Sequence, residues 1–167
     1  MAVARCGDAC RVDGRLIQTL KKIGTIRMAQ AAEHTEAHVL LAGESARNEA
    51  DGSIRLVGGR CDDCGTLFFP SAHVCPECMS EAVAAADLAR EGTLYSWSVV
   101  HVAPKGWNTP YIAGYVDLSD GVRVFAHITG TEASALEMDM PVEVTTAILG
   151  DDDGVPVESY AFTPGKG

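Results

Sequence analysis

Four cysteines, arranged in two pairs of identical spacing, are the residues of this chain whose types and spacing best fit a known chemistry. Cys61 and Cys64 form one C-x-x-C pair, and Cys75 and Cys78 form a second. Two residues between the cysteines let both sulfurs of a pair face one point, and four thiolates are a ligand set that zinc favours in closed tetrahedral sites. We therefore predict one structural Zn²⁺ at these four side chains. A closed site leaves no position for a substrate, so the ion is expected to stabilise the fold rather than to catalyse.

Other potential ligands leave alternatives open. Iron in a rubredoxin-type site accepts the same four thiolates. His73 lies between the two cysteine pairs and is expected to be a surface residue. Near the N-terminus, Cys6 and Cys10 are four residues apart, as are His34 and His38, and residues at that spacing share one face of a helix. The gap between these two pairs is longer than in ordinary zinc fingers, so we interpret them as unpaired cysteines and surface histidines.

The segments that must position these residues fall into three regions. Residues 1–53 carry most of the helical signal, because Leu16, Leu20 and Ile23 recur at helical spacing and residues 25–48 are rich in alanine and glutamate. Residues 54–80 are expected to form a zinc ribbon, with short strands at 54–57 and 66–69 on either side of the first cysteine pair. Residues 81–167 are expected to form a small β-barrel.

The barrel region shows the residue pattern of short strands. Strands are predicted at 93–102, 111–118, 122–128, 141–149 and 156–162. A short helix is predicted at 131–137 with Thr131 near its N-cap, and the acidic turn 151–153 is expected to be solvated. Four or five short strands with one small helix before the last pair are typical of a Greek-key barrel of OB type. The predicted fold class is therefore mainly β, with an N-terminal helical segment, a rubredoxin-like zinc ribbon and a C-terminal OB-fold barrel.

The composition argues against several classes of protein. The net charge is −10, whereas a free-standing nucleic-acid binder usually carries a basic surface. Hydrophobic residues make up 47% and charged residues 22% of the 167 residues, which suits a packed core rather than disorder. No apolar stretch is long enough to span a membrane, and no secretory signal is visible. Because four of the six cysteines have metal-site spacing, we expect a cytoplasmic protein without a disulfide framework.

Several motifs between residues 58 and 162 together resemble one known family. They are GRCDDCG at 59–65, FP at 69–70, CPEC at 75–78, GTLYSW at 92–97, VVH at 99–101 and PY at 110–111. The cysteine pairs alone would match many ribbons, but their combination with the later motifs is much more specific. The chain resembles the zinc-ribbon/OB-fold family of acyl-CoA-associated proteins, which are accessory subunits of thiolases and thiolase-like enzymes.

The resemblance implies a protein partner and a CoA thioester. A chain of this kind is expected to bind a thiolase-like subunit that carries the catalytic residues, so no catalytic residue is assigned here and the acyl transfer belongs to the complex. A thiolase of anaerobic aromatic degradation, such as a benzoylsuccinyl-CoA thiolase, is one context that the resemblance implies. A thiolase-like aldolase and a thiolase–synthase assembly are others. Two-fold symmetry around a partner dimer would give a heterotetramer.

One loop between two predicted strands carries the residues best suited to ligand or partner contact. Lys105 could neutralise a phosphate of CoA, while Trp107 or Tyr111 could stack on its adenine or line a thioester channel. Exposed tryptophan is also a frequent anchor of protein interfaces, and we favour that role over direct CoA contact. The two roles coincide if the ligand binds at a subunit boundary.

Two other functions remain as alternatives. A nucleic-acid-binding ribbon with an OB barrel is one, because both modules bind nucleic acid in other proteins. The acidic charge and the scarcity of cations after residue 105, where Arg123 stands alone up to residue 165, argue against it. A scaffold that tethers two enzymes without touching ligand is the other. His101 and His127 lie in predicted strands and are expected to be strand-face residues rather than catalysts.

Overall fold

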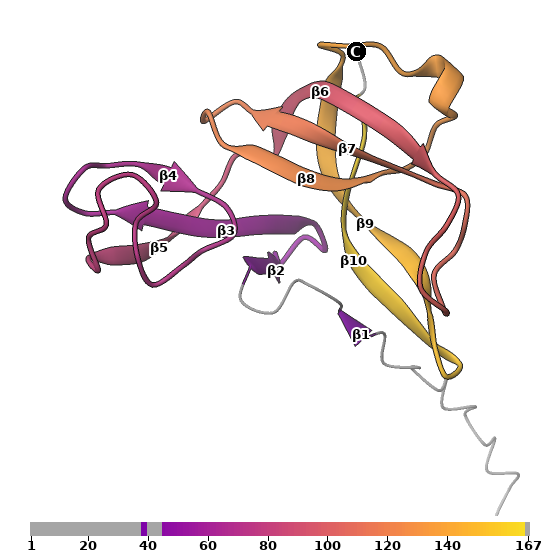
Figure 1. Ribbon diagram of the computed structural model, residues 1–167, viewed down its shortest axis with the longest axis horizontal. Coiled ribbons are helices and arrows are strands. Elements are labelled where there is room, and N and C mark those ends of the chain that lie inside the picture. The colour runs from indigo at the N-terminus through magenta and orange to yellow at the C-terminus, as the bar shows by residue number, and fades with distance from the viewer. Residues whose placement is uncertain (1–37, 40–44, 166–167) are drawn as a thin grey trace, which may run out of the picture. The chain divides into compact units, whose positions relative to one another are not determined.

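The computed structural model describes residues 38–39 and 45–165 of the chain. In chain order the elements are the strands β1 (His38–Val39), β2 (Ala46–Asn48), β3 (Ile54–Cys61), β4 (Leu67–Phe68), β5 (Val83–Asp87), β6 (Glu91–Val100), β7 (Tyr111–Leu118) and β8 (Arg123–Ile128), the 3-10 helix η3 (Ala133–Ala135), and the strands β9 (Pro141–Asp152) and β10 (Val155–Pro164). Figure 1 shows them in this order along the colour bar. Most of the predicted N-terminal helical segment lies outside the described residues, as do Cys6, Cys10 and His34. At β1 and β2 the chain is extended and not helical.

Five strands close a barrel. The strands follow one another in the order β6-β7-β8-β10-β9, and β9 returns to pair with β6. The β8–β10 pairing is parallel and the other four pairings of the barrel are antiparallel. The helix η3 lies in the crossover between β8 and β9. The predicted mainly β fold with an OB-type barrel is therefore confirmed.

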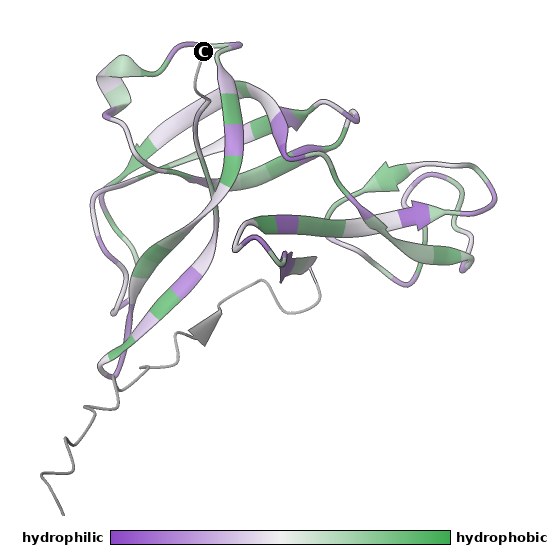
Figure 2. Cartoon of the chain, turned by 180° about the vertical axis from the view of Figure 1, so that it is seen from behind, coloured by the Kyte–Doolittle hydropathy of each residue, from purple (hydrophilic) through white to green (hydrophobic). Residues whose placement is uncertain are grey.

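The core of the barrel forms because apolar residues alternate with polar ones along the strands. In β8, Val124, Ala126 and Ile128 are buried, whereas Arg123 and Phe125 are exposed. Bands of hydrophobic and hydrophilic residues follow one another along several strands in Figure 2. This period-2 pattern places one face of each strand in the core and the other outside.

A second sheet forms the ribbon around β3. The strands β2, β4 and β5 all pair with β3 in antiparallel fashion. The first ribbon strand was predicted to end at residue 57, but β3 continues through Gly58 and Gly59 to Cys61. A Cβ atom on either glycine would collide with Phe68 of the neighbouring strand β4, so glycine is required by this close approach rather than by a turn.

Several details of the barrel differ from expectation. The strand predicted at 93–102 is β6, Glu91–Val100, so His101 lies in the loop that follows it and not in a strand. The predicted seven-residue helix is a 3-10 turn of three residues, Ala133–Ala135, and its N-cap is Glu132 rather than Thr131. The strand β9 runs on to Asp152, so the acidic turn forms the tip of the β9–β10 hairpin, where Asp153 and Gly154 have positive φ.

Among the described residues, no helix has the length and apolar character needed to cross a membrane.

Candidate metal centre and loop site

The four cysteines of the two C-x-x-C pairs converge on one point. Their sulfur atoms all lie within 4.8 Å of one another. The Sγ atoms of Cys61 and Cys78 are 3.5 Å apart, and those of Cys64 and Cys75 are 3.6 Å apart. Four sulfurs around a tetrahedral Zn²⁺ would be separated by about 3.8 Å, given a Zn–S distance of about 2.3 Å. The donor set and its spacing therefore fit a single tetrahedral ion.

The two cysteine pairs sit in equivalent backbone turns, which we call knuckles (residues 61–66 and 75–80). In each knuckle the first cysteine donates its N–H to the carbonyl five residues later, at Thr66 and at Ser80. Its carbonyl accepts an N–H from the residue four positions on, Gly65 or Met79. The first cysteine of each knuckle is fully buried and the second is exposed. Repeating one local geometry thus aims all four sulfurs inward.

Hydrogen bonds support the thiolate form of Cys64 and Cys75. The backbone N–H of Glu77 donates to Cys75 Sγ at 3.4 Å, and Cys64 Sγ lies 3.2 Å from the Thr66 hydroxyl. The bond to Thr66 lowers the pKa of the Cys64 thiol to about 6. A thiol with a lowered pKa is deprotonated at neutral pH, which is the form that binds metal.

The pKa of Cys78 shifts in the opposite direction. Although the hydrogen bond from the Ser80 backbone lowers it, the neighbouring sulfurs of Cys64 and Cys61 outweigh that bond and raise the pKa of the Cys78 thiol to about 12. His73 is exposed and does not belong to the cluster.

The loop that carries Lys105 and Trp107 is fixed to the barrel by backbone hydrogen bonds. Asn108 N–H donates to the carbonyl of Leu149 at 2.9 Å, and Asp151 N–H donates to the carbonyl of Gly106 at 2.6 Å. The pairing brings Gly106 against Gly150, and a Cβ on either glycine would collide with the backbone of the opposite segment. The two glycines thus allow the loop to form a short ladder with β9.

Trp107 stacks on the outer face of the barrel beside two other rings. The Trp107 and His127 ring centroids are 5.5 Å apart in a stacked arrangement, and those of Tyr111 and His127 are 4.5 Å apart. The Trp107 and Tyr111 rings are themselves separated by 5.9 Å. Of the three loop residues predicted from the sequence, Trp107 and Tyr111 therefore come together. Their bridging residue, His127, was not predicted to contribute to this site.

His127 combines a half-buried ring with a buried polar atom that lacks a partner. Its Nε2 atom has no hydrogen bond. Burial lowers the pKa of His127, so the ring is neutral at physiological pH. The same face also holds a hollow of about 310 Å³, whose polar lining includes Asn108 and His127. The alternation along β8 shows from the sequence that His127 faces outward, but its contact with Trp107 depends on the path of the loop.

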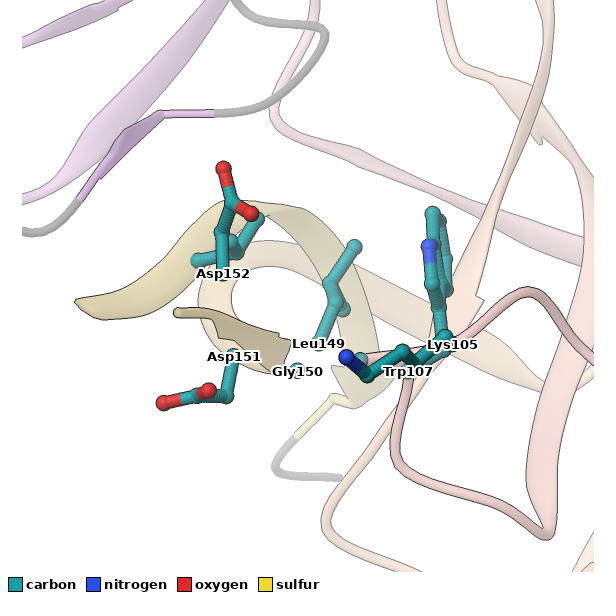
Figure 3. A pocket seen from close by; sticks show the side chains of 8 residues that line it. Lys105, Trp107, Leu149, Gly150, Asp151 and Asp152 are labelled. Atoms are coloured by element: carbon teal, nitrogen blue, oxygen red, sulfur yellow. The ribbon is translucent and has the colours of Figure 1, made fainter. Parts of the chain in front are cut away.

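Lys105 lies in a different pocket from Tyr111. This pocket of about 200 Å³ is lined by Lys105 and Trp107 on one side and by the end of β9, including Asp151 and Asp152, on the other (Figure 3). Two carboxylates and only one ammonium line the pocket, and this net negative charge is unfavourable for a phosphate group. The prediction that these aspartates are only solvated was incomplete, because the return of the hairpin tip to the loop depends on the tertiary fold.

Comparison with known proteins identifies two matching domain families. Residues 49–84 match the ChsH2 rubredoxin-like zinc ribbon domain, and residues 85–147 match the ChsH2 C-terminal OB-fold domain. The benzoylsuccinyl-CoA thiolase subunit BbsA of Thauera aromatica is 42% identical over 108 residues, which are 64% of this chain and 74% of that protein. A DUF35 domain-containing scaffold protein of Methanocaldococcus jannaschii is 35% identical over 114 residues, 65% of this chain and 81% of that protein.

A solved structure also matches this chain and belongs to a ChsH2-containing complex. A chain of the Ltp2-ChsH2(DUF35) aldolase is 32% identical and matches with a TM-score of 0.52. The match covers 66% of this chain and 84% of that one. The similarity thus extends over the ribbon and the barrel in sequence and in structure.

Proposed function

The chain belongs to the ChsH2-type family of zinc-ribbon/OB-fold proteins, and on that premise we propose that it is a non-catalytic subunit of a heteromeric acyl-CoA thiolase or thiolase-like complex. The observation that carries the proposal is the 42% identity to a thiolase subunit, over 74% of that subunit's length. In this role the chain binds a thiolase-like protein and assists the handling of a CoA thioester.

The chemistry of the described residues supports placing the reaction on the partner. Thiolysis requires an acyl-accepting cysteine that is activated by a neighbouring base. All four cysteines of the described part of the chain converge on the metal cluster. A Zn²⁺ bound there by Cys61, Cys64, Cys75 and Cys78 would be closed to substrate and would fix the ribbon. The acyl-accepting cysteine would then be supplied by the thiolase-like subunit.

The loop site supports a positioning role at the subunit boundary. Trp107 and Tyr111 offer aromatic surface held in place by His127 and by the ladder to β9. We assign these rings to contact with the partner and with the acyl-CoA at their shared boundary. Lys105 is assigned to partner contact rather than to a CoA phosphate, because Asp151 and Asp152 line its pocket. A loop that is already ordered loses little conformational entropy when the complex forms.

A thiolase-like aldolase is a second candidate for the complex. The solved structure that matches this chain at 32% identity is titled as an aldolase. Thiolysis and retro-aldol cleavage would make the same demands on an accessory subunit, namely docking and orientation of the thioester. The reaction assay of the purified complex distinguishes the two, since only thiolysis consumes free CoA.

The test is to recover the full-length chain from its native host with an affinity tag and to identify its partner by mass spectrometry. We expect a thiolase-like protein, in a complex with the mass of a heterotetramer. The partner should turn over acyl-CoA more efficiently when this chain is present. Recovery of the chain without any thiolase-like protein, or turnover of acyl-CoA by the isolated chain, would contradict the proposal.

A matched pair of variants tests the loop. Trp107→Ala should weaken complex formation or raise the KM for acyl-CoA by about tenfold, because a buried aromatic anchor is lost at the interface. Val102→Ala provides the control, since Val102 lies in the same loop and is 87% exposed. Both variants should retain the circular dichroism spectrum of the wild type. Equal activity and equal assembly of the two variants would count against the assigned role of Trp107.

A further inference from the structure

Exposed aromatic side chains cluster on the outer face of the strands β6, β7 and β8. Tyr95 is 46% exposed, Tyr115 is 45% exposed and Phe125 is 56% exposed. Together with Asp117 and Arg123 they form what we call the aromatic face. Aromatic residues and arginine are enriched in protein interfaces, whereas an isolated barrel gains little stability from leaving them in water.

Contacts across the strands hold the aromatic face in one arrangement. Asp117 and Arg123 are direct partners in the β7–β8 register, and so are Tyr115 and Phe125. Arg123 donates two hydrogen bonds to Asp117, of 2.6 and 2.8 Å, while its guanidinium carbon lies 3.6 Å from the ring centroid of Tyr95. The Tyr115 and Phe125 rings are 5.1 Å apart. These side chains are therefore ordered before any partner binds, which lowers the entropy cost of association.

The aromatic face continues into the loop site. Phe125 and His127 are two residues apart on β8 and therefore point to the same side of the sheet. His127 is the residue on which Trp107 and Tyr111 stack. A partner that covers Phe125 would consequently lie close to His127 and the loop site.

The acidic charge of the barrel favours a partner whose surface is basic. Residues 91–165 contain eleven carboxylates but only two cations of the Lys/Arg type, Lys105 and Arg123. Arg123 is paired with Asp117, so the centre of the aromatic face is neutral while the rest of the barrel is acidic. A second copy of this chain or a nucleic acid would bring further negative charge and would be repelled.

We propose that the aromatic face is the surface through which the chain docks onto its thiolase-like subunit, and that this subunit presents an apolar patch bordered by lysine or arginine. The inference rests on the proposed function and adds to it the location and the chemistry of the interface. Phe125 and Tyr115 supply the apolar centre, and Arg123 is held by Tyr95 and Asp117 for a hydrogen bond to the partner.

The affinity of the purified chain for the thiolase-like subunit recovered from the host, measured by titration calorimetry, tests this inference. Phe125→Ala and Arg123→Ala should each weaken binding by about tenfold or more. Met138→Ala is the matched control, because Met138 is 68% exposed and lies outside β6–β8. It should bind as the wild type does. Raising the salt concentration should weaken binding of the wild type, since attraction between an acidic barrel and a basic rim is screened.

The outcomes separate this inference from the proposed function. If the wild type binds the thiolase-like subunit and both variants bind it as tightly as the wild type does, the aromatic face is not the docking surface, while the proposed function stands. If no thiolase-like protein binds the wild type, the proposed function fails and the docking face fails with it. A homodimer of the isolated chain that Phe125→Ala dissociates, seen by sedimentation, would also overturn the inference, because it assigns the face to a second copy.

Discussion

The two metal-binding knuckles differ at one backbone position. Gly65 and Met79 lie four residues after the first cysteine of their knuckles, and their φ angles are +77° and +61°. A non-glycine residue pays about 1–2 kcal/mol for this left-handed conformation, because its Cβ approaches the following carbonyl. Met79 is 74% exposed, so its side chain contributes little packing that could offset the cost.

We therefore expect Met79→Gly to raise the free energy of unfolding of the zinc-loaded protein by about 0.5–1 kcal/mol, since the greater freedom of unfolded glycine cancels part of the gain. Gly65→Ala should lower it by about 1–2 kcal/mol for the converse reason. No atom lies within 4 Å of a Cβ built on Gly65, so backbone strain alone acts there. Urea unfolding of both variants measures the effect, and a loss of stability in Met79→Gly would show that its side chain has a structural role.

The half-buried His127 makes the stability of the barrel depend on pH. Because burial lowers the pKa of His127 in the folded state, the unfolded chain takes up a proton at a higher pH than the folded chain does. The contribution of His127 to stability is complete above the ordinary histidine pKa of about 6.5, and it is lost progressively as the pH falls from that value through the lower pKa of the folded state.

His127→Phe tests this dependence, since phenylalanine keeps a ring between Trp107 and Tyr111 but does not titrate. The wild type should lose more stability than the variant between about pH 8 and about pH 5.5, when both are unfolded in urea. The carboxylates titrate in both proteins and cancel in the comparison. Parallel pH profiles would show that the His127 ring is freely hydrated.

Residues differ in how far the sequence alone predicts their role. The metal cluster was predictable because each C-x-x-C pair aims its sulfurs through local geometry, and only two such pairs had to meet. The stack of Trp107, His127 and Tyr111 was not, because it depends on the path of a ten-residue loop (101–110) and on strand register. The pocket that Lys105 lines together with the hairpin tip could not be predicted for the same reason.

At the scale of elements, a single substitution should break the hydrogen bonds between the loop and β9. Gly150→Ala places a methyl group against the carbonyl of Gly106, so the bonds from Asn108 to Leu149 and from Asp151 to Gly106 should break. The barrel strands do not depend on these bonds and should persist. Hydrogen exchange should therefore accelerate by about tenfold at the amides of Asn108 and Asp151, with little change in β7 and β8.

Gly165→Ala is the control for this prediction. A Cβ on Gly165 would meet Pro141 at ordinary contact distances of 3.5 and 3.6 Å, so no rearrangement is required. Its exchange pattern should equal that of the wild type. Unchanged protection of Asn108 in Gly150→Ala would mean that the loop tolerates the displacement and is not fixed by the ladder.

The strands were predictable to different degrees for a physical reason. The limits of β7 agree with the prediction at both ends, because half of its residues are β-branched or aromatic and the strand ends at the Ser119–Gly121 turn. Neither β2 nor β5 was predicted. The β5 sequence, VAAAD, has weak strand propensity, and these residues become a strand because β3 offers free backbone partners.

At the scale of the whole described chain from residue 45 to 165, the ribbon and the barrel share one hydrophobic core. Ile54 and Leu56 of β3 and Leu88 after β5 belong to the same buried cluster as Leu94 and Val142 of the barrel. Burial of an isoleucine or leucine side chain contributes about 1.5–3 kcal/mol. A ribbon that loses its order would thus remove several kcal/mol from the barrel.

Removal of the predicted Zn²⁺ should consequently destabilise both parts together. The four sulfurs would be left near one another without a bridging ion, and β3 would lose the anchor at its Cys61 end. We expect calorimetry to show one unfolding transition for the zinc-loaded protein, which a chelator shifts to lower temperature as a whole. Cys78→Ser should behave like the chelated protein even in excess zinc, because a tetrahedral site needs four ligands. If the barrel melted at the same temperature with and without metal, the shared core would contribute little, and the ribbon would be an independent module that only docks against it.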